Sequence, residues 1–167
     1  MRETIAKDAL RAFLGTLVAV AVYSFAGAGA PALLVVFNAF SVVVLYFSIR
    51  RGEIFGALLG TMCGLAQDAF SLGVFGVAGL TKTLLGFWTG YVSRRIDIVP
   101  FSRNALFMLV MSVLEMLLWV LLTALVRVHA VNLQGGLLFL QPIVTAVLGS
   151  SLFVLERRIK ARASRGA

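Results

Sequence analysis

Long apolar runs follow one another along this chain, and nearly all of its charged residues fall between them. A helix needs about 20 apolar residues to cross the roughly 30 Å hydrocarbon core of a bilayer. Six runs come close to this length, at about 12–29, 31–49, 54–72, 74–92, 104–126 and 136–155. The pattern therefore predicts an all-α integral membrane protein, folded as a compact bundle of six transmembrane helices.

The composition supports this prediction and argues against a separate aqueous domain. Of the 167 residues, 60% are hydrophobic and 13% are charged, whereas about 25% of the residues in a typical soluble domain are charged. Because six spans use most of the length, we expect residues 1–167 to form a single polytopic membrane domain. Little of the chain is left for a catalytic domain in water.

The basic residues predict the orientation of the spans, because cytoplasmic loops carry an excess of Lys and Arg. With the N-terminus inside, all of the 15 Lys and Arg except Lys82 and Arg127 fall on the cytoplasmic side. These residues are Arg2, Lys7, Arg11, Arg50, Arg51, Arg94, Arg95, Arg103, Arg157, Arg158, Lys160, Arg162 and Arg165. We therefore expect both termini in the cytoplasm and a basic cytoplasmic tail at 156–167. The net charge of +8 would orient the chain or contact membrane lipids, with no nucleic acid bound.

Three ionisable residues lie inside predicted spans, where each costs about 2.5–3.5 kcal/mol at mid-helix. Two of them, Asp68 and Lys82, each lie seven residues from Phe75, the assumed centre of a helical reversal. Equal distances from the turn predict equal depth, and hence an ion pair or a polar cluster that includes Gln67. Such a cluster either shapes a surface for a partner or ligand, or is a buried structural pair that fixes the helix register.

The third intramembrane ionisable residue, Glu115, lies halfway along the span 104–126. It is expected to contact another helix, for instance through Asn38 or Thr145, or to be protonated because burial disfavours its charge. A role in proton transfer is the less favoured alternative.

Glycines at four-residue spacing mark two of the spans. Gly56, Gly60 and Gly64 lie on one face of the third span, and Gly86 and Gly90 on one face of the fourth. Small residues at this spacing allow close helix packing, either within the chain or against another protein, with the first alternative favoured. The reversal between these two spans is expected at 71–76, where Ser71, Gly73 and Gly76 lie.

No arrangement of residues typical of an enzyme or a metal site stands out. His129 is the only histidine and belongs to no H-E-x-x-H motif, and Cys63 is the only cysteine. A nucleophilic pair of His129 with Ser150 or Ser151 would join residues at different depths. The chain is therefore expected to be no enzyme and to hold no metal or other cofactor.

The segment that begins Gly64-Leu65-Ala66-Gln67-Asp68 resembles the rod shape-determining protein MreD family. The family pattern is Gly-Leu-x-x-Asp-x-x-Ser with a Leu-Gly a few residues later. Four positions match, namely Gly64, Asp68, Ser71 and Gly76. Phe75 replaces the usual leucine, and Pro31 lacks the acidic residue that often follows it. The resemblance covers roughly residues 31–125.

This resemblance implies a non-enzymatic scaffold of the cell-elongation machinery in the bacterial inner membrane, which supports peptidoglycan synthesis and rod shape. Its direct partner would be the single-span protein MreC. Through MreC it would reach MreB filaments, RodA and a class B penicillin-binding transpeptidase.

The six-helix architecture of the MreD family is similar to that of the substrate-binding (S) components of energy-coupling-factor transporters. The alternative function is therefore the substrate-binding subunit of a vitamin-type transporter, which requires polar contacts at the outer face. The last outer loop offers only Arg127, His129, Asn132 and Gln134 for such contacts.

Overall fold

A computed structural model describes residues 2–29, 36–70, 74–96, 101–126 and 139–163 of the chain. Within these residues the fold is all-α and has six principal helices. They are α1 (Arg2–Gly29), α3 (Ala39–Arg51), α4 (Glu53–Phe70), α5 (Val77–Ser93), α6 (Phe101–Val126) and α7 (Gln141–Ala163). The predicted number of helices agrees with the structure.

Several predicted boundaries are wrong. Helix α1 begins at Arg2 and not near residue 12, so the charged turns before the apolar run are also helical. Helix α3 begins only at Ala39, where the side chain of Asn38 caps it by accepting a hydrogen bond from the Ser41 N–H (3.3 Å). Helix α7 continues to Ala163, so the first part of the predicted tail is helical.

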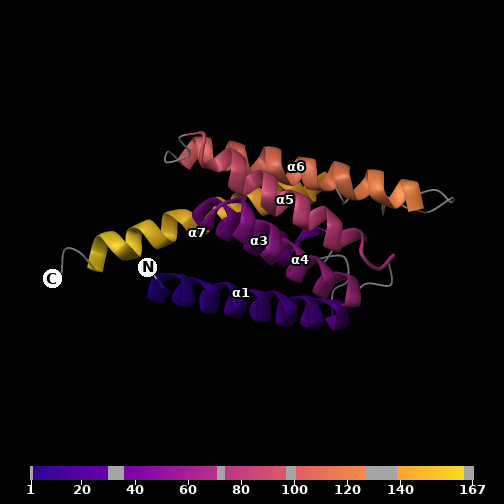
Figure 1. The fold of residues 1–167 in the computed structure, drawn as a ribbon, viewed down its shortest axis with the longest axis horizontal. Coiled ribbons are helices and arrows are strands. Elements are labelled where there is room, and N and C mark those ends of the chain that lie inside the picture. The colour runs from indigo at the N-terminus through magenta and orange to yellow at the C-terminus, as the bar shows by residue number, and fades with distance from the viewer. Residues whose placement is uncertain (1, 30–35, 71–73, 97–100, 127–138, 164–167) are drawn as a thin grey trace.

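Helix α3 lies at the centre of the bundle and packs against all five other helices (Figure 1). Helices α4 and α5 form a closely packed pair beside it, and α6 packs against α5 and α7. The described ends of α1 and α7 that lie nearest the two termini are at the same end of the molecule.

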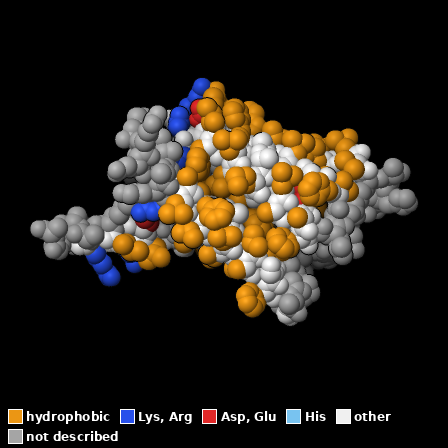
Figure 2. All heavy atoms as spheres, turned by 60° about the horizontal axis from the view of Figure 1, so that its bottom comes forward, with side chains coloured by type: hydrophobic (Ala, Val, Ile, Leu, Met, Phe, Trp, Pro, Cys, Tyr) orange, Lys and Arg blue, Asp and Glu red, His pale blue; other side chains and the backbone are white. Residues whose placement is uncertain are grey.

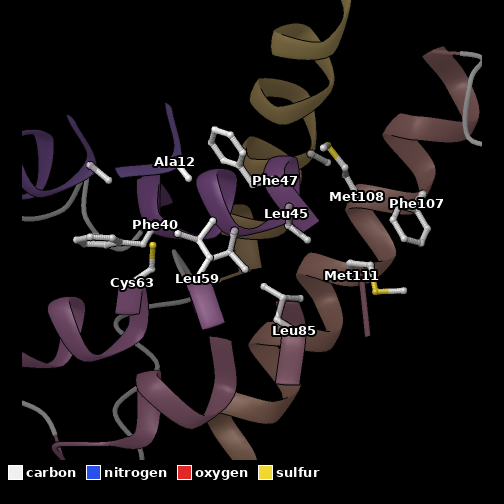
Figure 3. Close-up of a cluster of buried hydrophobic side chains, with 13 residues drawn as sticks. Ala12, Phe40, Leu45, Phe47, Leu59, Cys63, Leu85, Phe107, Met108 and Met111 are labelled. Atoms are coloured by element: carbon white, nitrogen blue, oxygen red, sulfur yellow. The ribbon is translucent and has the colours of Figure 1, made fainter. Parts of the chain in front are cut away.

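The hydrophobic core surrounds the central helix (Figure 3). It is built from side chains of every helix in the bundle, among them Ala12, Phe40, Leu45, Phe47, Leu59, Cys63, Leu85, Met108 and Met111. Phe40, Val44 and Leu45 of α3 have no exposed surface. Residues on every side of α3 are buried because the other five helices pack around it.

Only one described helix, Phe101–Val126, is both long and apolar enough to cross a membrane by itself. Shorter apolar helical stretches are Ala9–Phe25 and Gln141–Glu156. Helix α3 has 13 residues and spans only about 20 Å. Among the described residues, one of the six predicted spans therefore meets this test of length and composition.

Candidate functional site

A buried ion pair joins α5 to α6 in the interior of the bundle. The Lys82 ammonium donates to Oε1 of Glu115, and their side chains are 2% and 5% exposed. Ser41 of α3 completes the group: its hydroxyl donates to the same Glu115 oxygen (2.6 Å) and accepts from the Lys82 ammonium (2.7 Å). Three helices are thus linked by one polar cluster, which we call the Ser41–Lys82–Glu115 triad.

The contacts of the triad hold α3, α5 and α6 together. A serine beside a lysine is one arrangement used by nucleophilic enzymes, but Ser41 has no exposed surface that a substrate could reach. The ammonium of Lys82 is also occupied by its contacts with the Glu115 carboxylate and the Ser41 hydroxyl. Removing one partner of a buried pair leaves an uncompensated charge, so the triad fixes which residues of α3, α5 and α6 face each other.

The predicted direct pair between Asp68 and Lys82 is wrong. The carboxylate of Asp68 instead accepts backbone N–H groups at the start of α5, from Gly76 (2.9 Å), Ala78 (3.2 Å) and Gly79 (2.9 Å). The first N–H groups of a helix have no partner inside the helix, and they carry partial positive charge. Asp68 therefore caps α5 from the end of α4.

The register of α4 against α5 explains why this pair does not form. Gly60 lies against the backbone of Lys82, and Gly64 lies against that of Ala78. These facing positions are symmetric about residue 71, four positions before the centre that the sequence suggested. Asp68 is therefore two helical turns, about 12 Å, from the level at which Lys82 lies.

The glycine series form a seam between α4 and α5. A β-carbon at Gly56 would overlap the Gly86 carbonyl oxygen, and one at Gly86 would overlap that of Gly56. At the end of the seam, a β-carbon at Gly90 would overlap the backbone of Gly52 and Glu53. The neighbour of both series is thus within the chain, which was the favoured alternative. The hydroxyls of Thr61 and Thr83 hydrogen bond across the same seam (2.8 Å).

Gln67 belongs to a second polar contact beside the triad. Its side-chain oxygen accepts a hydrogen bond from the amide of Asn38 (3.2 Å), which joins α4 to the start of α3. Asn38 or Thr145 was the contact suggested for Glu115 from the sequence. The structure instead gives Glu115 the interhelical contacts with Ser41 and Lys82, while the Thr145 hydroxyl is buried without a partner among the described residues.

Some predicted site residues lie outside the described part of the chain. They are Ser71 and Gly73 of the reversal, and Arg127, His129, Asn132 and Gln134 of the last outer loop. Gly76 is described, and it has a left-handed backbone conformation (φ 97°) just before α5. Glycine adopts this conformation without steric cost, so the turn can present the Gly76 N–H to Asp68.

Ser41 is the member of the triad that sequence reasoning missed. It lies three positions after Asn38 and seven positions before Ser48, so the three polar residues follow one helical face. All three are buried, with exposures of 6%, 0% and 0%. A polar stripe within an otherwise apolar span was the signal that could have revealed an inward-facing side of α3.

Basic residues at the end of α3 and after α5 lie at one end of the bundle, where Glu156 of α7 also lies. Arg50 donates to Glu156 of α7 (2.5 Å), and the Tyr46 hydroxyl donates to the other oxygen of the same carboxylate (2.5 Å). Arg94 donates to the Arg51 carbonyl oxygen (2.9 Å). The α3–α4 turn, the end of α5 and the final part of α7 therefore share one end of the molecule, and Figure 2 shows Lys and Arg side chains gathered there.

Comparisons with protein-family models, with curated proteins and with solved structures find no match for this chain. Among the residues that the structure describes, no group of three or more His, Cys, Asp or Glu side chains is placed to hold a metal ion.

Proposed function

We propose that the chain is a multi-pass membrane protein that acts as a non-enzymatic scaffold of the bacterial cell-elongation machinery. The observation that carries the membrane part of the proposal is the reversed polarity of the bundle. Ionic and polar side chains lie inside it, while large apolar side chains cover much of its outside (Figure 2).

Helix α6 shows this reversed polarity most plainly. Its polar residues Asn104, Ser112 and Glu115 are at most 4% exposed, whereas Leu106 and Leu125 are 63% and 74% exposed. Water would favour the opposite arrangement, because burying a charge is costly and burying leucine is favourable. Lipid acyl chains are the environment in which leucine outside and glutamate inside is stable.

The ends of the bundle support the same proposal. Basic residues near Arg50, Arg94 and Glu156 share one end, as expected when positive charge is retained on the cytoplasmic side. Arg95 also lies over the ring of Tyr91 at this end (4.1 Å from its centroid). Aromatic and basic side chains are enriched together at membrane–water interfaces.

The assignment to cell elongation rests on the resemblance to the MreD family. The matched Asp68 has a structural reason to be aspartate, because it caps three N–H groups of α5. Gly64 also has a reason to be glycine, because the α5 backbone lies against it. The outer apolar surface provides helix faces on which the single span of MreC could pack in the inner membrane.

Depletion of the chain in its host bacterium, combined with co-purification, tests this function. We expect depleted cells to lose their rod shape and the tagged chain to co-purify from membranes with a single-span coiled-coil protein. Cells that stay rod-shaped would contradict the proposal. A vitamin bound to the purified chain would favour the substrate-binding transporter subunit instead.

A further inference from the structure

Three polar atoms of α6 and α7 are buried without a hydrogen-bond partner in the described part of the chain. They are the second carboxylate oxygen of Glu115 (Oε2), the hydroxyl of Ser112 and the hydroxyl of Thr145. These residues are 4%, 2% and 0% exposed. Buried polar atoms in folded proteins almost always have a partner, so a cluster of three indicates a ligand with hydrogen-bonding groups.

The hydroxyls of Ser112 and Thr145 differ from most other hydroxyls in the described helices. Thr81, Ser150 and Ser151 each donate to the carbonyl oxygen four residues earlier in their own helix, a common way for a helical hydroxyl to be satisfied. Ser112 and Thr145 do not make this bond. Their hydroxyls are therefore available for a partner between the helices.

The packing of α6 against α7 brings the three atoms to neighbouring levels. Ser112 lies one helical turn before Glu115 on the same face of α6. One turn earlier, Met108 packs against Gly149, and the Ser150 hydroxyl contacts its sulfur atom (3.8 Å). The two helices run in opposite directions (Figure 1). Ser112, one turn after Met108, therefore lies at the level of Thr145, one turn before Gly149. Ser112 and Thr145 thus face each other.

We infer that a water molecule binds inside the bundle between α6 and α7, held by Glu115 Oε2, Ser112 Oγ and Thr145 Oγ1. Water can donate to the carboxylate and exchange hydrogen bonds with both hydroxyls, and buried waters make about three hydrogen bonds. A cation does not fit the site, because Lys82 already balances the charge of Glu115 and a second positive charge would be buried unpaired. The site is independent of the proposed role in cell elongation.

Water-edited solid-state NMR of the chain in lipid bilayers tests the inference directly. Magnetisation should pass from water to the Thr145 side chain and the Glu115 carboxyl severalfold faster than to Thr81. Thr81 is the matched control, because it is 1% exposed and its hydroxyl is bonded within α5. Equally slow transfer to Thr145 and Thr81 would overturn the inference. Resonances of Ser112 and Thr145 that shift on titration with Na⁺ or K⁺ would also overturn it, by assigning the site to a cation.

Variants provide a second test. If water bridges the hydroxyls, Thr145→Val and Ser112→Ala should each lower Tm by about 2–4 °C. The decrease in Tm of the double variant should be smaller than the sum of the two single decreases. Thr145→Ser keeps the hydroxyl and should retain more stability than Thr145→Val, while Thr81→Val should leave Tm unchanged. Tm values for Thr145→Val and Ser112→Ala at or above that of the original chain would contradict a bound water, because removing an unsatisfied hydroxyl does not destabilise.

Discussion

At the scale of single residues, the stability of the interior depends on the pairing of Lys82 with Glu115. Both charges are buried, and Ser41 is the neutral group that hydrogen bonds to both. In an interior of low dielectric constant, each charge is tolerated only because the other is present. The pair is thus more important for selecting one helix arrangement than for adding net stability.

This account predicts an asymmetry between single and double substitutions. Lys82→Met alone should reduce the free energy of unfolding by about 3–5 kcal/mol, because it leaves Glu115 charged and unpaired. Adding Glu115→Leu should restore much of that loss. Equilibrium unfolding in detergent micelles would measure both. The comparison pair is Arg50 with Glu156, which is 27% and 22% exposed, so that Arg50→Met should cost only about 1 kcal/mol. Equal costs for Lys82→Met and Arg50→Met would contradict the account.

Asp68 has a different function, and its substitution should give a graded result. Asp68→Ala removes the acceptor of three N–H groups and should cost about 1–2 kcal/mol of unfolding free energy. Asp68→Asn keeps one acceptor oxygen and should fall between the original chain and Asp68→Ala. The exchange of Asp68→Lys with Lys82→Asp should rescue neither single variant, since the two residues lie two turns apart. Rescue of folding by that exchange, measured by the yield of folded protein, would show that they pair.

At the scale of helices, close packing of α4 against α5 depends on the absence of side chains at the glycine seam. Gly60→Ala would place a methyl group against the Lys82 carbonyl oxygen, and overpacking of this kind costs about 1–3 kcal/mol. Gly15→Ala in α1 is the matched control, because its nearest neighbour, a side-chain carbon of Phe47, would be 3.6 Å away. We expect thermal unfolding to show a loss for Gly60→Ala and no loss for Gly15→Ala. A tolerated Gly60→Ala would contradict the seam.

The helices also show what a sequence can and cannot predict. The existence of all six helices, the glycine seam and the inward-facing Glu115 follow from apolar periodicity, small-residue spacing and the cost of exposing a charge to lipid. The α4–α5 register does not follow, because a reversal can begin at any of several residues and Asp68 can cap a helix as well as pair with a lysine. The triad does not follow from the sequence either. It forms only where three helices pack together, and its three residues lie far apart in the chain.

At the scale of the whole molecule, polarity is reversed relative to a protein in water. Apolar side chains such as Phe13, Leu58 and Leu106 are more than half exposed, while the triad is buried in the interior. The basic residues meet at one end, near Arg50 and Arg94. The proposed membrane location rests on these two distributions, and it predicts that the basic end faces the cytoplasm.

Labelling of single cysteines in intact cells tests this central claim most directly. In a Cys63→Ala background, one variant carries Arg95→Cys at the basic end of α5, and the other carries Phe75→Cys just before its opposite end, where Phe75 is 70% exposed. A maleimide that cannot cross membranes should label the Phe75→Cys variant in spheroplasts and the Arg95→Cys variant only after permeabilisation. Labelling of the Arg95→Cys variant without permeabilisation, or recovery of the chain in the soluble fraction, would contradict the account.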